Sequence, residues 1–99
     1  MLHEIKIEKT YADAITEGRK NFEVRINDRG YNAGDNVHFN VIAKTGTVTG
    51  WVYVDHKLNE EIYKITYVHS GLGLKEDYVV FGIEKTDMKP RGAIREVDR

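Results

Sequence analysis

The stretch from Gly18 to Arg29 holds an unusually varied set of reactive side chains for a sequence of 99 residues. It carries cations, carboxylates and amides in close succession: Arg19, Lys20, Asn21, Glu23, Arg25, Asn27, Asp28 and Arg29. Three of these alternate with apolar residues, so Glu23, Arg25 and Asn27 share one strand face, about 6–7 Å apart per pair. A lysine, a glutamate and an arginine around one cleft present donors and an acceptor to a nucleobase edge or a phosphate.

The position of Lys20 decides whether this polar face is complete. Lys20 lies three residues before Glu23, and in a regular strand this spacing points it to the opposite face. It joins the face only if the chain bends between Gly18 and the strand. In that case a partly buried Lys20 beside Arg25 suits a general base. The alternative is a surface ion pair between Glu23 and Arg25, worth about 0–1 kcal/mol.

Other candidates lie outside this face. Tyr67 and Tyr78 are possible platforms for base stacking, and the alternative is that they are half-buried core residues. Asp28 and Arg29 have the residue types of a turn, although Arg29 is also within reach of a phosphate. Trp51 is expected in the core or at a barrel rim. We predict no metal site and no cofactor, since no ligand spacing joins the four histidines His3, His38, His56 and His69.

Six strands are predicted to position these groups. Alternation of apolar and polar residues predicts strands over residues 3–7, 21–27, 37–41, 49–54, 62–69 and 78–84. Residues 55–61 fit a loop, a helical turn or a continued strand. So many strands in a short chain must pair tightly or close on themselves to avoid exposed edges. A small barrel with one helix plugging an end is the economical solution.

One short helix is predicted between the first two strands. It opens at Thr10, where Thr10 and Asp13 have the form of a capping box. Its buried face is expected to carry Tyr11, Ala14 and Ile15. Gly18 follows the last turn and suits the left-handed position that ends a helix.

Composition indicates one globular domain. The chain is 40% hydrophobic and 31% charged, and we expect a domain over residues 1–86 with a charged, flexible tail over 87–99. The formal net charge of −1 argues against strong nonspecific nucleic-acid binding but leaves room for a local basic groove. The absence of cysteine excludes disulfides, and no apolar run resembles a signal peptide or a bilayer span. We therefore expect a cytoplasmic monomer without membrane contact.

Several strings of residues resemble known families. The residues from Gly18 to Arg25 match the G-x-K-x-x-E-x-R signature of ASCH domains, a branch of the PUA-like β-barrel superfamily. Further strings resemble the small bacterial and phage proteins known as DUF3850, namely His3-Glu4-Ile5-Lys6-Ile7, Asn27-Asp28-Arg29, Gly34-Asp35, Ile65-Thr66-Tyr67-Val68, Gly71-Leu72 and Tyr78-Val79-Val80. Together they span nearly all of residues 3–84. The resemblance implies a mostly β (α+β), PUA-like small barrel with a cleft beside the helix and the second strand.

The same resemblance implies a function. ASCH domains are proposed to bind RNA, which makes this chain a candidate RNA- or nucleotide-binding module with the ligand contacts Lys20, Glu23, Arg25, Asn27, Arg29, Tyr67 and Tyr78. One ASCH branch hydrolyses the amide of N4-acetylcytidine, with a lysine at the position of Lys20 and a threonine at that of Glu23. Glu23 therefore favours binding over this hydrolysis. The alternatives are an amidohydrolase that uses Lys20 and Glu23, and a protein-interaction or regulatory module.

Overall fold

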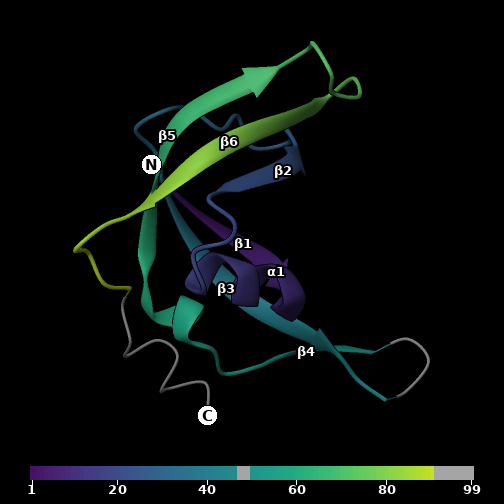
Figure 1. The fold of residues 1–99 in the computed structure, drawn as a ribbon, viewed down its shortest axis with the longest axis vertical. Helices are drawn as coiled ribbons and strands as arrows, with labels where there is room; N and C mark the ends of the chain where they lie inside the picture. Colours follow the sequence, from purple (N-terminus) through teal and green to yellow (C-terminus); the bar gives the residue numbers. More distant parts are fainter. Residues whose placement is uncertain (47–49, 91–99) are drawn as a thin grey trace.

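The computed structural model describes residues 1–46 and 50–90 (Figure 1). Eight elements follow one another in these ranges: β1 (Leu2–Glu8), α1 (Lys9–Thr16), β2 (Phe22–Ile26), β3 (Asn36–Lys44), β4 (Trp51–Tyr53), the 3-10 helix η1 (Lys57–Glu60), β5 (Ile62–Ser70) and β6 (Tyr78–Lys85). The predicted mostly β fold is confirmed, and residues 57–60 are a helical turn. Residues 47–49 and 91–99, which include the start of one predicted strand and most of the predicted tail, lie outside the described ranges.

The six strands belong to one sheet in the order β1-β3-β5-β6-β2, with β4 paired to β3 beside this path. β1 runs parallel to β3, and the other pairs are antiparallel. β1 and β2 stand at the two ends of the order, and within the described residues no ladder joins them. The predicted closed barrel is therefore not formed, because the strands of residues 1–46 and 50–90 make one curved sheet whose two ends do not pair. No helix in this part of the chain is long and apolar enough to cross a membrane.

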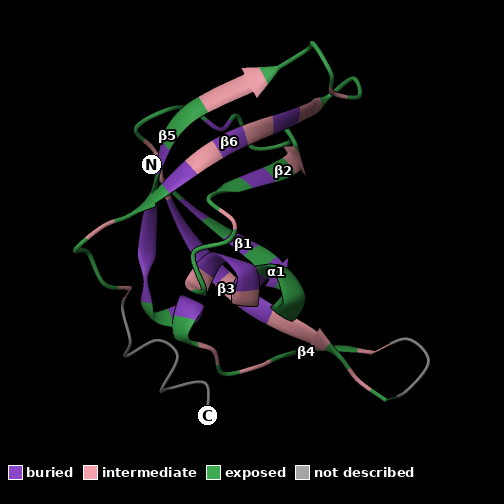
Figure 2. Cartoon of the chain, in the orientation of Figure 1, coloured by how far each residue is buried: buried purple, intermediate pink, exposed green. Residues whose placement is uncertain are grey.

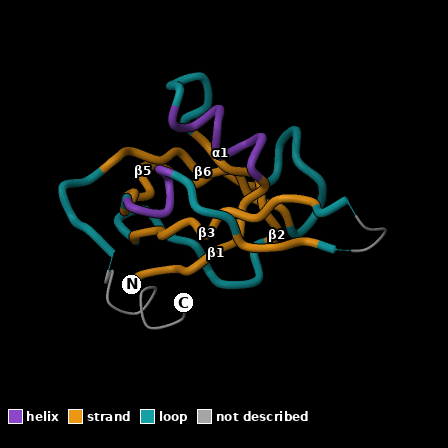
Figure 3. The backbone as a smooth tube through the Cα atoms, turned by 90° about the horizontal axis from the view of Figure 1, so that it is seen from below, coloured by secondary structure: helices purple, strands orange, loops and turns teal. Residues whose placement is uncertain are grey.

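One apolar core fills the concave side of the sheet. Its largest fully buried side chains include Phe39, Phe81, Ile5, Leu58 and Ile65. α1 lies against β1, β3 and η1, on one side of the strands in the view of Figure 3. The helix buries Ala12, Ala14 and Ile15. The expectation that Tyr11 lies on this buried face is wrong, because its side chain is exposed and Ala12 takes the place.

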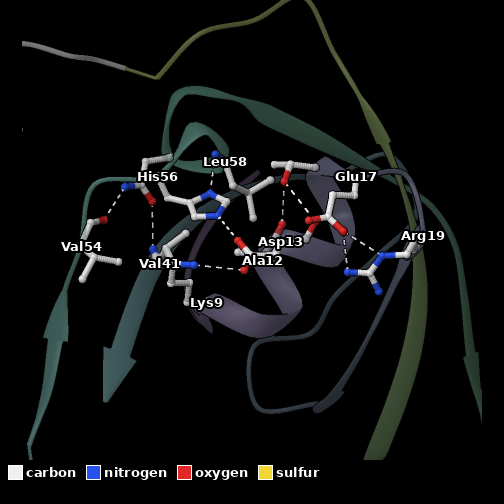
Figure 4. Close-up of polar contacts among 11 residues, drawn as sticks. Lys9, Ala12, Asp13, Glu17, Arg19, Val41, Val54, His56 and Leu58 are labelled. Atoms are coloured by element: carbon white, nitrogen blue, oxygen red, sulfur yellow. Dashed lines mark hydrogen bonds and ion pairs between the residues drawn. The ribbon is translucent and has the colours of Figure 1, made fainter. Parts of the chain in front are cut away.

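The start of α1 also differs from the prediction. The N-cap is Glu8, and no side chain caps the helix, so the predicted capping box is wrong. Asp13 instead joins the helix to η1 (Figure 4). Its Oδ1 accepts a hydrogen bond from His56 Nε2 at 2.8 Å, and its Oδ2 accepts one from Lys9 Nζ at 3.1 Å. His56 Nδ1 in turn accepts from the Leu58 amide at 3.0 Å, which places the ring proton on Nε2.

In β2, the polar side chains point toward the protein interior and the apolar side chains point toward solvent. Glu23 is only 6% exposed, whereas Val24 is 48% exposed. Phe22 and Ile26 are exposed to a similar extent. The register explains this, because Glu23 pairs with Phe81 and Arg25 with Val79, both of which point into the core. Figure 2 shows exposed and buried positions alternating along β2. The polar residues of this strand therefore face the interior of the curved sheet.

This orientation can be tested with a matched pair of valines. Val24→Thr should change the free energy of unfolding by less than about 0.5 kcal/mol, since the new hydroxyl meets water. Val79→Thr should cost about 1–3 kcal/mol, because Val79 is 3% exposed and its hydroxyl would be buried among apolar groups. Urea unfolding followed by circular dichroism measures both values. A larger loss for Val24→Thr than for Val79→Thr would contradict the described orientation of β2.

The junction between α1 and η1 predicts a dependence on pH. Hydrogen bonds from His56 and Lys9 hold the pKa of Asp13 below its ordinary value. The resulting stability is therefore present above the unfolded-state pKa of about 3.9 and is lost as pH falls through the lower folded-state pKa. Asp13→Asn should unfold more easily than the parent chain at pH 7, and the difference should shrink as the pH is lowered.

Thermal unfolding between pH 7 and pH 3 checks this expectation. Asp87→Asn is the control, since Asp87 is exposed and has no ion-pair partner among the described residues. A difference between Asp13→Asn and the parent that stays constant with pH would exclude the ionised carboxylate as the stabilising group.

Candidate ligand-binding cleft

Two arginines bridge the free edges of β1 and β2. Arg25 NH1 donates to the carbonyl of Lys6 at 2.9 Å, and Arg29 NH1 donates to the carbonyl of Glu4. Glu4 and Lys6 are two residues apart in β1, so their carbonyls point to the same side of the strand, away from β3. The guanidinium groups thus donate hydrogen bonds to carbonyls that could otherwise accept from the backbone amides of a neighbouring strand. They link the two edges, although no backbone ladder joins β1 and β2 in the described residues.

A cleft of about 440 Å³ lies at this seam. Its aliphatic lining residues are Ile7, Val24, Ile26 and Ile42, and the others are charged or aromatic. The cations are Lys6, Arg25 and Arg29, the carboxylates are Glu8, Glu23 and Asp28, and the aromatic residues are Tyr11, Tyr31 and Tyr78. The volume falls within the roughly 300–1,000 Å³ that small-molecule sites occupy.

Glu23 is the centre of the polar network on this wall. Its Oε1 accepts from Lys20 Nζ, and its Oε2 accepts from Arg25 NH1 at 3.2 Å. The Lys20 and Glu23 side chains are almost fully buried, so this is an internal ion pair and not a surface one. Lys20 Nζ also donates to the Phe22 carbonyl at 2.7 Å and lies 5.3 Å from the centre of the Tyr11 ring. Lys20 therefore neutralises Glu23 and leaves Arg25 oriented toward the seam.

The bend that brings Lys20 to Glu23 is present. Gly18 has φ of +80°, in the left-handed region, as expected for the residue that ends α1. The amides of Arg19 and Lys20 both donate to the Ala14 carbonyl, at 2.9 and 3.1 Å. These bonds fold the chain tightly around the helix end. Lys20 consequently contacts Glu23, but it lines a neighbouring hollow with Phe22 and Val24 and not the cleft itself.

Tyr31 places a buried hydroxyl at the cleft. The residue is 4% exposed, and its ring packs 4.9 Å from that of Phe81 and 4.8 Å from that of His3. Burial raises the pKa of this hydroxyl, while the nearby charges of Arg25 and Arg29 act in the opposite direction. No hydrogen bond joins the hydroxyl to any described residue. Burial of a polar group without a hydrogen-bond partner costs about 1–3 kcal/mol. The hydroxyl of Tyr31 is therefore available for a hydrogen bond with a bound molecule.

The seven residues predicted to contact a ligand are distributed unevenly. Glu23, Arg25, Arg29 and Tyr78 line the cleft. Lys20 supports Glu23 from outside, and Asn27 Oδ1 accepts from the Tyr31 amide at 3.1 Å and so shapes the turn after β2. Tyr67 is exposed on β5 and does not line the cleft. Trp51 is exposed on β4, so the expected position in the core is wrong.

Lys6 and Tyr31 are among the lining residues that sequence reasoning missed. Lys6 lies on the polar face of the first strand, but the sequence gives no sign that this strand borders β2. Tyr31 lies between two turns, where no periodicity reveals whether a side chain is buried. Its only sequence signal is its position four residues after Asn27, which caps the turn through its side chain.

Two buried histidines are each paired with a carboxylate. His3 contacts Asp35 at 2.9 Å, and His38 contacts Glu4 at 2.7 Å. No group of three histidine, aspartate or glutamate side chains in the described ranges has the arrangement to hold a metal ion. The chemistry available at the seam is therefore that of guanidinium, phenol and carboxylate groups. These groups suit recognition of a polar or anionic molecule.

The sheet and its seam coincide with a recognised family domain. No protein with a curated description matches the chain. The family model described as domain of unknown function (DUF3850) matches residues 2–83, which include β1, β2 and every residue that lines the cleft. The chain therefore belongs to the DUF3850 family.

Proposed function

We propose that the cleft between β1 and β2 binds RNA or a nucleotide-like ligand. The observation that carries this proposal is the convergence of Arg25, Arg29 and the unpartnered hydroxyl of Tyr31 on one cleft of about 440 Å³. Guanidinium groups recognise phosphate through paired hydrogen bonds. Each arginine donates to the protein through NH1, and its other N–H groups remain for a ligand.

The charge balance of the cleft supports an anionic ligand. The lining holds three cations and three carboxylates, but the Glu23 charge is neutralised by Lys20 from outside the lining. The cleft is therefore locally cationic, although the whole chain has a net charge of −1. The aromatic rings of Tyr11 and Tyr78 border the same space and offer surfaces for a base. Lys20 donates to Glu23 and to the Phe22 carbonyl, which favours a supporting role over that of a base for amide hydrolysis.

Binding can be followed by NMR with nitrogen-labelled protein. Addition of a nucleoside 5′-monophosphate or a short RNA should shift the amides of Lys6, Arg25, Arg29 and Tyr31. The amides of the β5–β6 turn, such as Leu72, should not move. Absence of shifts at the seam with millimolar ligand would reject the proposal.

An arginine of the cleft should contribute more to ligand affinity than an arginine outside it. Arg29→Ala should weaken binding about tenfold to 100-fold, since a hydrogen bond to a charged group is worth about 1.5–3 kcal/mol. Arg19→Ala is the control, because Arg19 is exposed and, within residues 1–46 and 50–90, pairs only with Glu17. For a single-stranded RNA that contacts both cleft arginines, the slope of log K against log salt should be about −1.4. Equal losses for Arg29→Ala and Arg19→Ala would contradict a role for the cleft.

Tyr31→Phe separates ligand binding from folding. It removes a hydroxyl that has no partner among the described residues, so the free energy of unfolding should stay the same or rise. Nucleotide affinity should fall about twofold to tenfold, the equivalent of one neutral hydrogen bond of about 0.5–1.5 kcal/mol. Calorimetry measures both quantities. A loss of stability without a loss of affinity would assign the hydroxyl to the fold and not to a ligand.

A further inference from the structure

β4 carries two exposed aromatic side chains on one face. Trp51 is 46% and Tyr53 is 63% exposed, and residues two apart in a strand point to the same side. Tyr53 pairs with Ile42 and Trp51 with Lys44, so the two rings follow one another along the end of β3. Figure 1 shows β4 and the end of β3 extending away from the rest of the sheet. Nothing in the described part of the chain covers this aromatic face.

The aromatic face continues the cleft. Ile42, the partner of Tyr53, lines the cleft. Lys6 lines the cleft wall, and its ammonium lies 5.9 Å from the centre of the Tyr53 ring. Beyond Tyr53 comes Trp51, with the exposed Lys44 opposite it. Tyr53 and then Trp51 therefore follow one another outward from the cleft, and each has a lysine beside it.

We propose that the ligand is a single-stranded nucleic acid, with one nucleotide in the cleft and the next bases stacked on Tyr53 and Trp51. This inference rests on the proposed function of the cleft and specifies its ligand. Aromatic side chains on a sheet surface stack two or three successive bases in established RNA-binding folds. Such stacking tolerates any base, because every base has a flat face. Lys6 and Lys44 are placed to meet the phosphates between the stacked bases.

The single tryptophan of the chain makes the inference measurable. The probes are uridine 5′-monophosphate and oligouridylates of two, four and six nucleotides. The monophosphate should shift the cleft amides without quenching Trp51 fluorescence. The four- and six-nucleotide strands should shift the same amides, quench the fluorescence, and bind at least tenfold more tightly than the monophosphate.

Variants separate stacking from other effects. Trp51→Ala should weaken binding of the six-nucleotide strand about fivefold to 100-fold, and should leave monophosphate binding unchanged. Trp51→Phe keeps a ring and should retain most of the affinity. Tyr67→Ala is the control, since Tyr67 is an exposed aromatic residue on β5 outside the cleft. Circular dichroism confirms that each variant is folded.

The outcomes distinguish the two proposals. If affinity does not increase with length and Trp51 is not quenched, while the monophosphate still binds at the seam, the extended ligand is wrong and the cleft proposal stands. If neither the monophosphate nor any strand binds, both are wrong. If the oligouridylates quench Trp51 fluorescence but Arg29→Ala does not weaken their binding, the aromatic face of β4 does not continue the cleft. This inference then fails.

Discussion

The internal ion pair between Lys20 and Glu23 is the contact on which the described site depends. A carboxylate as deeply buried as that of Glu23 requires a compensating charge and hydrogen bonds, because desolvation of an unpaired ion is costly. Lys20 and Arg25 supply both. With this compensation, the polar face of β2 can lie toward the interior, and its apolar face lies outward. Breaking such a pair by removing one partner typically costs about 3–5 kcal/mol, so the orientation of β2 depends on all three residues.

The open seam follows from that orientation. Because Arg25 points inward from β2, its guanidinium reaches the edge of β1 and takes the Lys6 carbonyl, as Arg29 takes the Glu4 carbonyl. An edge carbonyl that accepts a hydrogen bond from an arginine side chain is satisfied without a neighbouring strand. The two edges stay apart, and the space between them is a cleft lined by cations and carboxylates. The same two arginines therefore link the ends of the open sheet and line the cleft.

Much of this was readable from the sequence. The strand period placed Glu23 and Arg25 on one face, whereas the position of Lys20 depended on a bend after Gly18 that the sequence left open. The mostly β fold and the β–α–β order also followed from periodicity and turn residues. In contrast, a period of two cannot tell which face of a strand points inward, and the inward orientation of the polar face depends on pairing with β6. The contribution of Lys6 and Tyr31 could not be predicted either, because it arises from contacts between segments far apart in the chain. Asp13 was misassigned for a similar reason, since its partner His56 lies 43 residues away.

A crystal structure of the protein with a short oligouridylate would locate the ligand relative to the cleft. We expect one phosphate within hydrogen-bond distance of the Arg25 and Arg29 guanidinium groups, with a polar ligand atom hydrogen-bonded to the Tyr31 hydroxyl. The Lys20–Glu23 pair should remain intact beneath the ligand. Density for the ligand on the outer apolar face of β2, or a seam filled by protein side chains while the ligand lies elsewhere, would contradict this expectation.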